Sequence, residues 1–246
     1  MAKSDKQTDR GALSETISVV VQALLLAFII RSFFFQPFNI PSGSMKPTLL
    51  VGDYIFVSKW SYGYSRYSFP FGIDIFDGRV WEGQPKRGDI VVFKYPPDPS
   101  KDYIKRVVGL PGDKIKLDSS VLSVNGTVVE RFREGTFVDQ GRGSSLEIPI
   151  FREKFANGMS HSTIDIQPGS PGDTTAVFEV PQDHYFFLGD NRDNSADSRY
   201  DVGMVPAENL VGKAQVIFLS LKDGASAWQI WRWPTAMRWD RLFKGL

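Results

Sequence analysis

The sequence predicts a mainly β protein, in which a single N-terminal transmembrane helix precedes a β-rich domain with an inserted β and loop region. One apolar run near the N-terminus is long enough to cross a bilayer. After it, short runs of β-branched and aromatic residues follow turn dipeptides, which is typical of strands. No long helical period follows residue 35, so we expect the rest of the chain to fold as sheets.

The apolar run extends from Ile17 to Ile30 and is interrupted by only two polar residues. A helix needs about 20 residues to span the hydrocarbon core, so residues 14–35 suffice if Arg31 reaches the interface. An inside N-terminus is favoured by the basic residues Lys3, Lys6 and Arg10. We therefore predict a cytoplasmic segment 1–13, a transmembrane helix 14–35 and an extracytoplasmic domain 36–246. A cleaved secretory signal is the alternative, although bulky aromatics rather than small residues follow the run.

The charges of the chain nearly cancel, with 29 Lys and Arg against 28 Asp and Glu. The chain therefore lacks the excess of positive charge that would favour a nucleic-acid partner. The sequence has no cysteine, which excludes disulfides and thiolate chemistry. The two histidines, His161 and His184, leave little for a metal site, so we expect neither a metal nor another cofactor.

Strand-like runs follow turn residues throughout the domain. They cover residues 54–57, 90–95, 103–108, 121–124, 127–129, 176–180, 185–188 and 211–220. Asn125-Gly126 separates two of these runs and is the strongest short-range signal for a hairpin. Residues 60–87 lack a helical period and predict a long surface loop or extended segment, whereas the polar, turn-rich residues 131–175 predict a variable insertion.

Two serines bracket a glycine where the chain leaves the apolar run: Ser42, Gly43 and Ser44. Gly43 permits a tight backbone path, and the prolines at positions 41 and 47 restrict the approach and the exit. Such a turn can hold a hydroxyl in one direction, as a nucleophile requires. An ordinary juncture between an anchor and a domain is the alternative.

Lys105 is the candidate base for such a serine. Apolar strand positions surround it, and alternation turns its neighbour Arg106 to the opposite face, where we expect solvent. A free lysine has a pKa of about 10.4, so only about one amine in a thousand is neutral near pH 7.5. Burial can lower that pKa enough to make the amine a general base. A strand-edge lysine in solvent is the alternative.

A third polar stretch, residues 189–199, follows the strand predicted at 185–188. Its short polar side chains can bond to their own backbone and predict a rigid loop. Four aspartates, counting Asp201, make a calcium loop conceivable. The interleaved Arg192 and Arg199 favour pairing between aspartate and arginine instead.

A Ser-His-Asp triad is a further alternative, but His161 lies in the predicted insertion and His184 at a strand edge. The Gly-x-Ser-x-Gly elbow, the Walker loop and the dinucleotide glycine fingerprint are all absent from the sequence. A serine can instead be activated by a neutral lysine amine.

In this order, and behind a membrane anchor, these stretches resemble the motif boxes of type I signal peptidases, the membrane-bound Ser-Lys proteases that remove signal peptides from exported proteins. The matching segments are residues 42–49, 52–54, 87–93, 105–113 and 189–199. The resemblance covers about residues 28–239, apart from residues 60–87 and 131–175. Many members have two transmembrane helices and some have a disulfide, and this sequence departs from both patterns.

The resemblance implies that Ser44 is the nucleophile and Lys105 the general base. It implies an oxyanion hole made by the backbone N–H of Ser44 and the hydroxyl of Ser42. The supporting residues would be Ser195, which orients the Lys105 amine, and the pair Asp197 and Arg199, which holds the loop.

We therefore expect a serine endopeptidase of the bacterial cytoplasmic (inner) membrane that removes N-terminal signal peptides through an acyl-enzyme, with its catalytic domain on the extracytoplasmic or periplasmic side. Its expected partners are signal-peptide-bearing preproteins and the lipid bilayer. The C-terminal tryptophans at 228, 231, 233 and 239 would contact the bilayer or, as the alternative, pack on the core of the domain itself. The alternatives are a related Ser-Lys peptidase with a narrow substrate, such as a conjugation pilin, and a non-catalytic anchored β-domain. A self-cleaving repressor is disfavoured because a membrane helix stands where DNA-binding helices would be.

Overall fold

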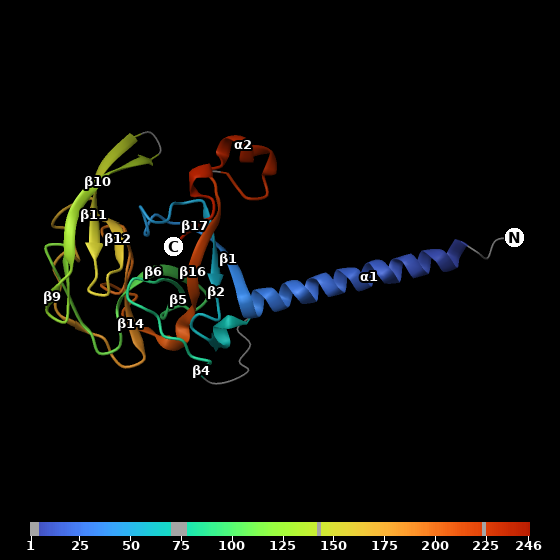
Figure 1. Cartoon of the computed structure of the whole chain (residues 1–246), viewed down its shortest axis with the longest axis horizontal. Coiled ribbons are helices and arrows are strands. Elements are labelled where there is room, and N and C mark those ends of the chain that lie inside the picture. The colour runs from blue at the N-terminus through green and yellow to red at the C-terminus, as the bar shows by residue number, and fades with distance from the viewer. Residues whose placement is uncertain (1–4, 70–77, 142–143, 223–224) are drawn as a thin grey trace.

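A computed structural model describes residues 5–69, 78–141, 144–222 and 225–246 of the chain. Helix α1 (Asp5–Ile29) continues through one π-helical turn, Ile30–Phe34, and projects from the β domain as a rod (Figure 1). Within the described residues, one helical stretch, Ser14–Phe34, is long and apolar enough to cross a membrane. The predicted anchor reaches one residue further, but Phe35 already pairs with Ser58 in the sheet.

The main sheet has eight strands, and all of its pairings are antiparallel. Its order is β1 (Phe35–Asn39), β2 (Asp53–Ser58), β16 (Leu210–Ser220), β5 (Ile90–Lys94), β6 (Asp102–Gly109), β14 (His184–Leu188) and β15 (Val205–Pro206), with β17 (Lys244–Gly245) paired to β16. Both faces of this sheet are buried at its central strands. Along β5, Ile90 and Val92 belong to one apolar cluster, whereas Val91 and Phe93 belong to another.

Three smaller sheets complete the described β structure. One contains β13 (Phe178–Glu179), β7 (Lys114–Asp118), β8 (Val121–Val124) and β9 (Thr127–Val128). The second contains β10 (Glu130–Gly141), β11 (Ser144–Lys154) and β12 (Ser160–Ile164), and the third β3 (Tyr64–Ser65) and β4 (Arg79–Val80). The remaining short helices are α2 (Trp233–Ala236) and single 3-10 turns at Arg66–Ser68, Ala207–Asn209, Ile230–Arg232 and Trp239–Arg241. The predicted mainly β class is therefore confirmed.

The Asn125-Gly126 hairpin forms as predicted. Both residues have positive φ, 54° and 79°, and the flanking Val124 and Thr127 are paired between β8 and β9. This backbone matches the twist of the two strands, which is why asparagine and glycine are preferred in such a turn.

Two segments are more ordered than the sequence indicated. Residues 131–175, predicted as an inserted β and loop region, contain most of the sheet of β10, β11 and β12, whose individual strands the polar, turn-rich sequence did not mark. Residues 60–87 were expected to form a long surface loop or an extended segment, and within them Tyr62 and Tyr64 are 2% and 8% exposed. The Tyr62 hydroxyl donates to Asp89 and the Tyr64 hydroxyl to the carbonyl of Phe33, so this segment is anchored to the domain. Residues 70–77 of the segment lie outside the described residues.

Candidate active site

The Ser-Gly-Ser stretch forms a tight turn between β1 and β2. The N–H of Lys46 donates to Gly43 O at 3.1 Å, and the N–H of Leu49 donates to Met45 O at 2.9 Å. Met45 and Leu49 are fully buried in the apolar cluster on one face of the main sheet. Burial of these two side chains fixes the turn against the sheet and so determines where Ser44 lies.

The structure brings Ser44 and Lys105 together. The Lys105 Nζ lies 2.8 Å from the Ser44 Oγ and donates a second hydrogen bond to the carbonyl of Ile104 at 3.0 Å. Both side chains are buried, with Ser44 6% and Lys105 5% exposed. The serine comes from the turn at residues 42–49, which we call the nucleophile turn because Ser44 is the candidate nucleophile, and the lysine comes from strand β6.

Burial lowers the pKa of Lys105 to about 8, although the negative charges of Asp197 and Asp190 act in the opposite direction. With that pKa, about a quarter of the amines are neutral near pH 7.5. The neutral form of such an amine is therefore populated at little energetic cost, and the hydroxyl at 2.8 Å lies within its reach as a proton donor.

Arg106 is not in solvent, which corrects the sequence expectation. Because both faces of the main sheet are covered, alternation along β6 moves Arg106 into a second buried site rather than to the surface. There its guanidinium donates to both oxygens of Asp190, at 2.8 and 2.6 Å. Thr48 donates to the same carboxylate at 2.5 Å. This group links the nucleophile turn, the base strand and the loop 189–199.

The loop 189–199 packs directly on the nucleophile turn. The backbone N–H of Asn191 donates to Ser44 O at 3.1 Å, and its side-chain amide donates to Gly43 O at 3.1 Å. Asp197 and Arg199 form two hydrogen bonds of 2.9 Å, and the N–H of Gly189 donates to Asp197 at 3.0 Å. The loop is therefore tied both to itself and to the backbone around Ser44.

Ser195 of this loop makes no hydrogen bond to Lys105 among the described residues. Its Oγ is buried and has no hydrogen-bond partner among the described residues. A Cβ added at Gly189 would lie 2.2 Å from that Oγ and 2.6 Å from Ser44 O, so the hydroxyl sits close to the nucleophile turn. Gly189 leaves the room that this close approach requires.

Ser42 is exposed, and its Oγ lies 3.5 Å from the Ser44 Oγ. Neither histidine reaches Ser44: His184 contacts the carbonyl of Gln182 at 2.8 Å, and His161 stacks on Phe155. The described residues therefore give Ser44 a lysine partner and not a histidine partner.

Sequence reasoning missed Glu153, which lies on β11 and is fully buried. The Arg192 guanidinium of the loop 189–199 donates to it at 2.6 Å. Glu153 stands in a polar stretch without a motif, so no pattern in the sequence marked it as a partner of the loop. The contact fastens the three-stranded sheet to the candidate site.

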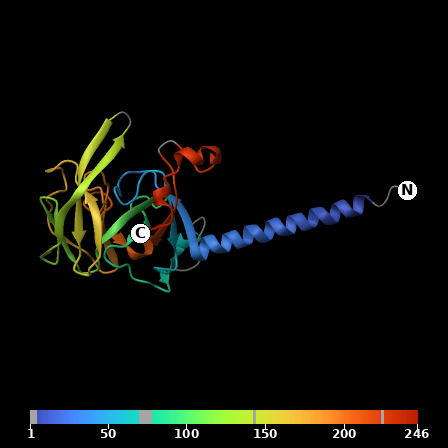
Figure 2. The same cartoon turned by 45° about the horizontal axis from the view of Figure 1, so that its top comes forward.

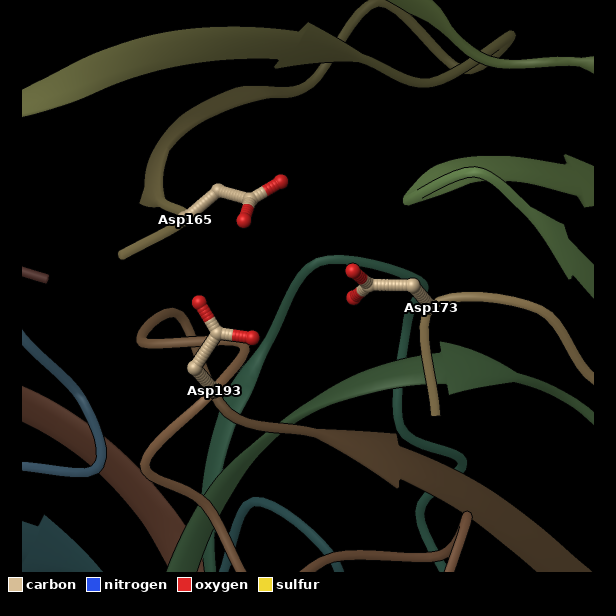
Figure 3. A group of neighbouring side chains, drawn as sticks. All are labelled: Asp165, Asp173 and Asp193. Atoms are coloured by element: carbon tan, nitrogen blue, oxygen red, sulfur yellow. The ribbon is translucent and has the colours of Figure 1, made fainter. Parts of the chain in front are cut away.

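The carboxylates of Asp165, Asp173 and Asp193 face one another, with ligand atoms within 4.8 Å (Figure 3). Each already accepts N–H donors. Asp193 accepts from Gln167 at 2.8 Å, Asp173 from Gly169 at 2.8 Å, and Asp165 from the Arg131 guanidinium at 2.9 Å. The cluster thus braces the loop against the preceding segment.

A family profile and full-length relatives place the chain in one family. The family profile described as "Signal peptidase, peptidase S26" matches residues 13–219. A signal peptidase I of Rickettsia typhi is 40% identical over 100% of this chain and 98% of its own length. One of Rickettsia prowazekii is 43% identical over 91% of this chain and 90% of its own length. A solved signal peptidase I of Enterococcus faecalis is 24% identical over 53% of this chain and 96% of its own, with a TM-score of 0.32. The chain therefore belongs to the signal peptidase family, peptidase S26, and is a membrane-anchored serine peptidase that removes signal peptides from preproteins.

Proposed function

We propose that this signal peptidase cleaves its substrates with Ser44 as the nucleophile and Lys105 as the general base. The observation that carries the assignment is the 2.8 Å contact between the Lys105 Nζ and the Ser44 Oγ in a buried site. The lowered pKa of Lys105, about 8, supports the same role because a usable fraction of the amine is neutral.

The reaction proceeds in two halves. The neutral Lys105 amine accepts the proton of Ser44 while the Oγ attacks the scissile carbonyl, and the resulting ammonium protonates the leaving amine of the mature protein. Lys105 then takes a proton from water, which attacks the ester, and returns that proton to the Ser44 Oγ as the ester bond breaks and the signal peptide leaves as a carboxylic acid. The N–H of Ser44 and the hydroxyl of Ser42 donate to the oxyanion in both halves.

Three residues of the loop 189–199 support this pair. Ser195 orients the Lys105 amine. Two observations support this role: the buried Ser195 hydroxyl has no hydrogen-bond partner among the described residues, and it lies next to the nucleophile turn. Asp197 and Arg199 hold the loop through their paired hydrogen bonds, and the carboxylate also receives the N–H of Gly189. These roles concern position rather than bond making.

We place the chain in the bacterial inner membrane with residues 1–13 inside and the β domain on the extracytoplasmic side, as the basic N-terminus favours. The C-terminal segment with α2 lies on the side of the domain from which α1 extends (Figure 1). Trp228, Trp231 and Trp239 of that segment are 69%, 66% and 63% exposed. Exposed tryptophans favour the headgroup region, so this segment would rest on the bilayer beside the anchor. Trp233 is only partly exposed, and its ring nitrogen is buried, so we do not count it among these contacts.

The direct test is to incubate the detergent-solubilised full chain with a secretory precursor and to sequence the new N-terminus. We expect a single cut after a small-x-small sequence, and no cut by Ser44→Ala. A mature N-terminus generated equally well by Ser44→Ala would refute the assignment of the nucleophile.

A further inference from the structure

The turn that carries Ser44 is held on two sides. Asn191 of the loop 189–199 binds the carbonyls of Gly43 and Ser44 on one side. On the other side stands Lys46, at the position that the Ser-Gly-Ser-Met-x-Pro motif leaves unspecified. The established reaction gives Lys46 no part, yet its side chain is well placed to act on the turn.

The aliphatic stem of Lys46 folds back over Gly43. A Cβ added at Gly43 would lie 3.2 Å from the Lys46 Cε and 3.4 Å from the Cδ. The N–H of Lys46 also donates to Gly43 O at 3.1 Å, so both its backbone and its stem bear on this residue. Gly43 separates Ser42 from Ser44, and any restraint on the stem is therefore a restraint on the backbone between the two serines.

The ammonium group of Lys46 is itself fixed by Asp139. Its Nζ lies 2.7 and 2.8 Å from the two carboxylate oxygens, and the side chains are 19% and 28% exposed. A charge-assisted contact to both oxygens, partly shielded from water, is stronger than a freely exposed ion pair. Asp139 comes from β10, and both cartoon views place the hairpin of β10 and β11 beside the nucleophile turn (Figures 1 and 2).

The hairpin holds Asp139 in a fixed position. Asp139 lies within the paired part of the hairpin, opposite Leu146. At its base, the buried Glu153 of β11 binds Arg192 at 2.6 Å, which ties the hairpin to the loop 189–199. The hairpin thus contacts the loop through Glu153 and the nucleophile turn through Asp139.

We propose that Lys46 and Asp139 are positioning residues for the peptidase reaction. Through the stem of Lys46 they hold the Ser42–Ser44 backbone in one conformation. The hairpin of β10 and β11 is then part of the active site although it contributes no reacting group. This inference rests on Ser44 being the nucleophile.

The experiment measures kcat and KM of the full chain in detergent on a secretory precursor, for Asp139→Asn, Lys46→Met and the double variant. Methionine keeps a stem over Gly43 and removes the charge. We expect each single change to lower kcat about five-fold, the size that one partly exposed ion pair can supply, with KM within about two-fold. The double variant should be no slower than either single one, because both break the same contact. Lys46→Arg should retain the wild-type kcat, since it restores the ion pair.

The matched control is Glu134→Gln, which removes a second ion pair of the same hairpin, with Arg152, at 37% and 32% exposure. It should leave kcat unchanged. A wild-type kcat in either single variant, equal losses in Asp139→Asn and Glu134→Gln, or additive losses in the double variant would each overturn the proposal. Ser44→Ala distinguishes failure of the proposed nucleophile from failure of the positioning role. If Ser44→Ala remains active, the proposed nucleophile is wrong. If Ser44→Ala is inactive but Asp139→Asn is fully active, only the positioning role is wrong.

Discussion

Two buried lysines in this chain, Lys59 and Lys105, differ in what their amines contact. Burial lowers the pKa of each to about 8. The Lys59 amine donates to the carbonyl of Ser68, which has no proton to give, whereas the Lys105 amine lies 2.8 Å from the hydroxyl of Ser44. A lowered pKa therefore does not by itself identify a catalytic base. The hydroxyl within reach of the amine makes the distinction.

The difference in role between Lys59 and Lys105 is tested most strongly by changing each lysine in turn. Lys105→Ala, Lys105→Arg and Ser44→Ala should each reduce kcat/KM by more than about a thousand-fold, because a reacting group is lost and a guanidinium stays protonated. Lys59→Met should stay within about two-fold of the wild type. Both expectations are measured by the rate at which the purified variants cleave a precursor, with circular dichroism as a check on folding. Activity above a few per cent in Lys105→Arg would contradict the account.

A smaller effect is expected where an orienting group is removed. Ser195→Ala should lower kcat by roughly 10- to 1000-fold, or roughly 1.4 to 4 kcal/mol of transition-state stabilisation. Steady-state kinetics on the same precursor measures it. Wild-type turnover would show that Ser195, whose Oγ is unbonded among the described residues, only fills space next to Gly189.

The lowered pKa of Lys105 also predicts a cost in stability. In the unfolded chain the pKa returns to about 10.5, so the unfolded state binds the proton more tightly; folding is penalised below pH 10.5, and the full penalty is present below pH 8. Lys105→Met should therefore raise the free energy of unfolding at pH 7 by up to roughly 3 kcal/mol. The gain should shrink as the pH rises from 8 to 10.5. Denaturant titrations at pH 7 and pH 10 test this, and equal gains at both pH values would argue against a buried amine of low pKa.

How much the sequence could predict depends on whether an interaction leaves a local pattern. Specific short motifs contain Ser44, Lys105 and the loop 189–199. The strands β2, β5, β6, β14 and β16 were predicted because each contains a short run of β-branched and aromatic residues. The burial of Arg106 was not predicted, because it depends on an apolar cluster that covers the far face of the sheet. Asp139 and Glu153 were missed for a similar reason. Each meets its partner across a long stretch of chain, 93 residues for Lys46 and Asp139.

A modest effect, on membrane binding rather than on catalysis, is expected in the C-terminal segment. Replacing Trp228, Trp231 and Trp239 with serine should weaken the binding of a chain lacking residues 1–35 to vesicles of anionic lipid, by about ten-fold. Phe218, which is partly buried and stacks on Phe56, offers a control position outside the segment. Co-sedimentation at low salt measures the binding. A shortened wild-type chain that never co-sediments would exclude this segment as a membrane contact.

The central claim is that the neutral amine of Lys105, and not that of Lys59, activates Ser44. The most direct measurement is the pH dependence of kcat/KM between pH 6 and 10 for the wild type and for Lys59→Met. Since only the neutral amine is a base, the rate should rise with pH and level off above a pKa of about 8, identically in both enzymes. A rate that does not change across this range, or a rise that disappears in Lys59→Met, would contradict the account.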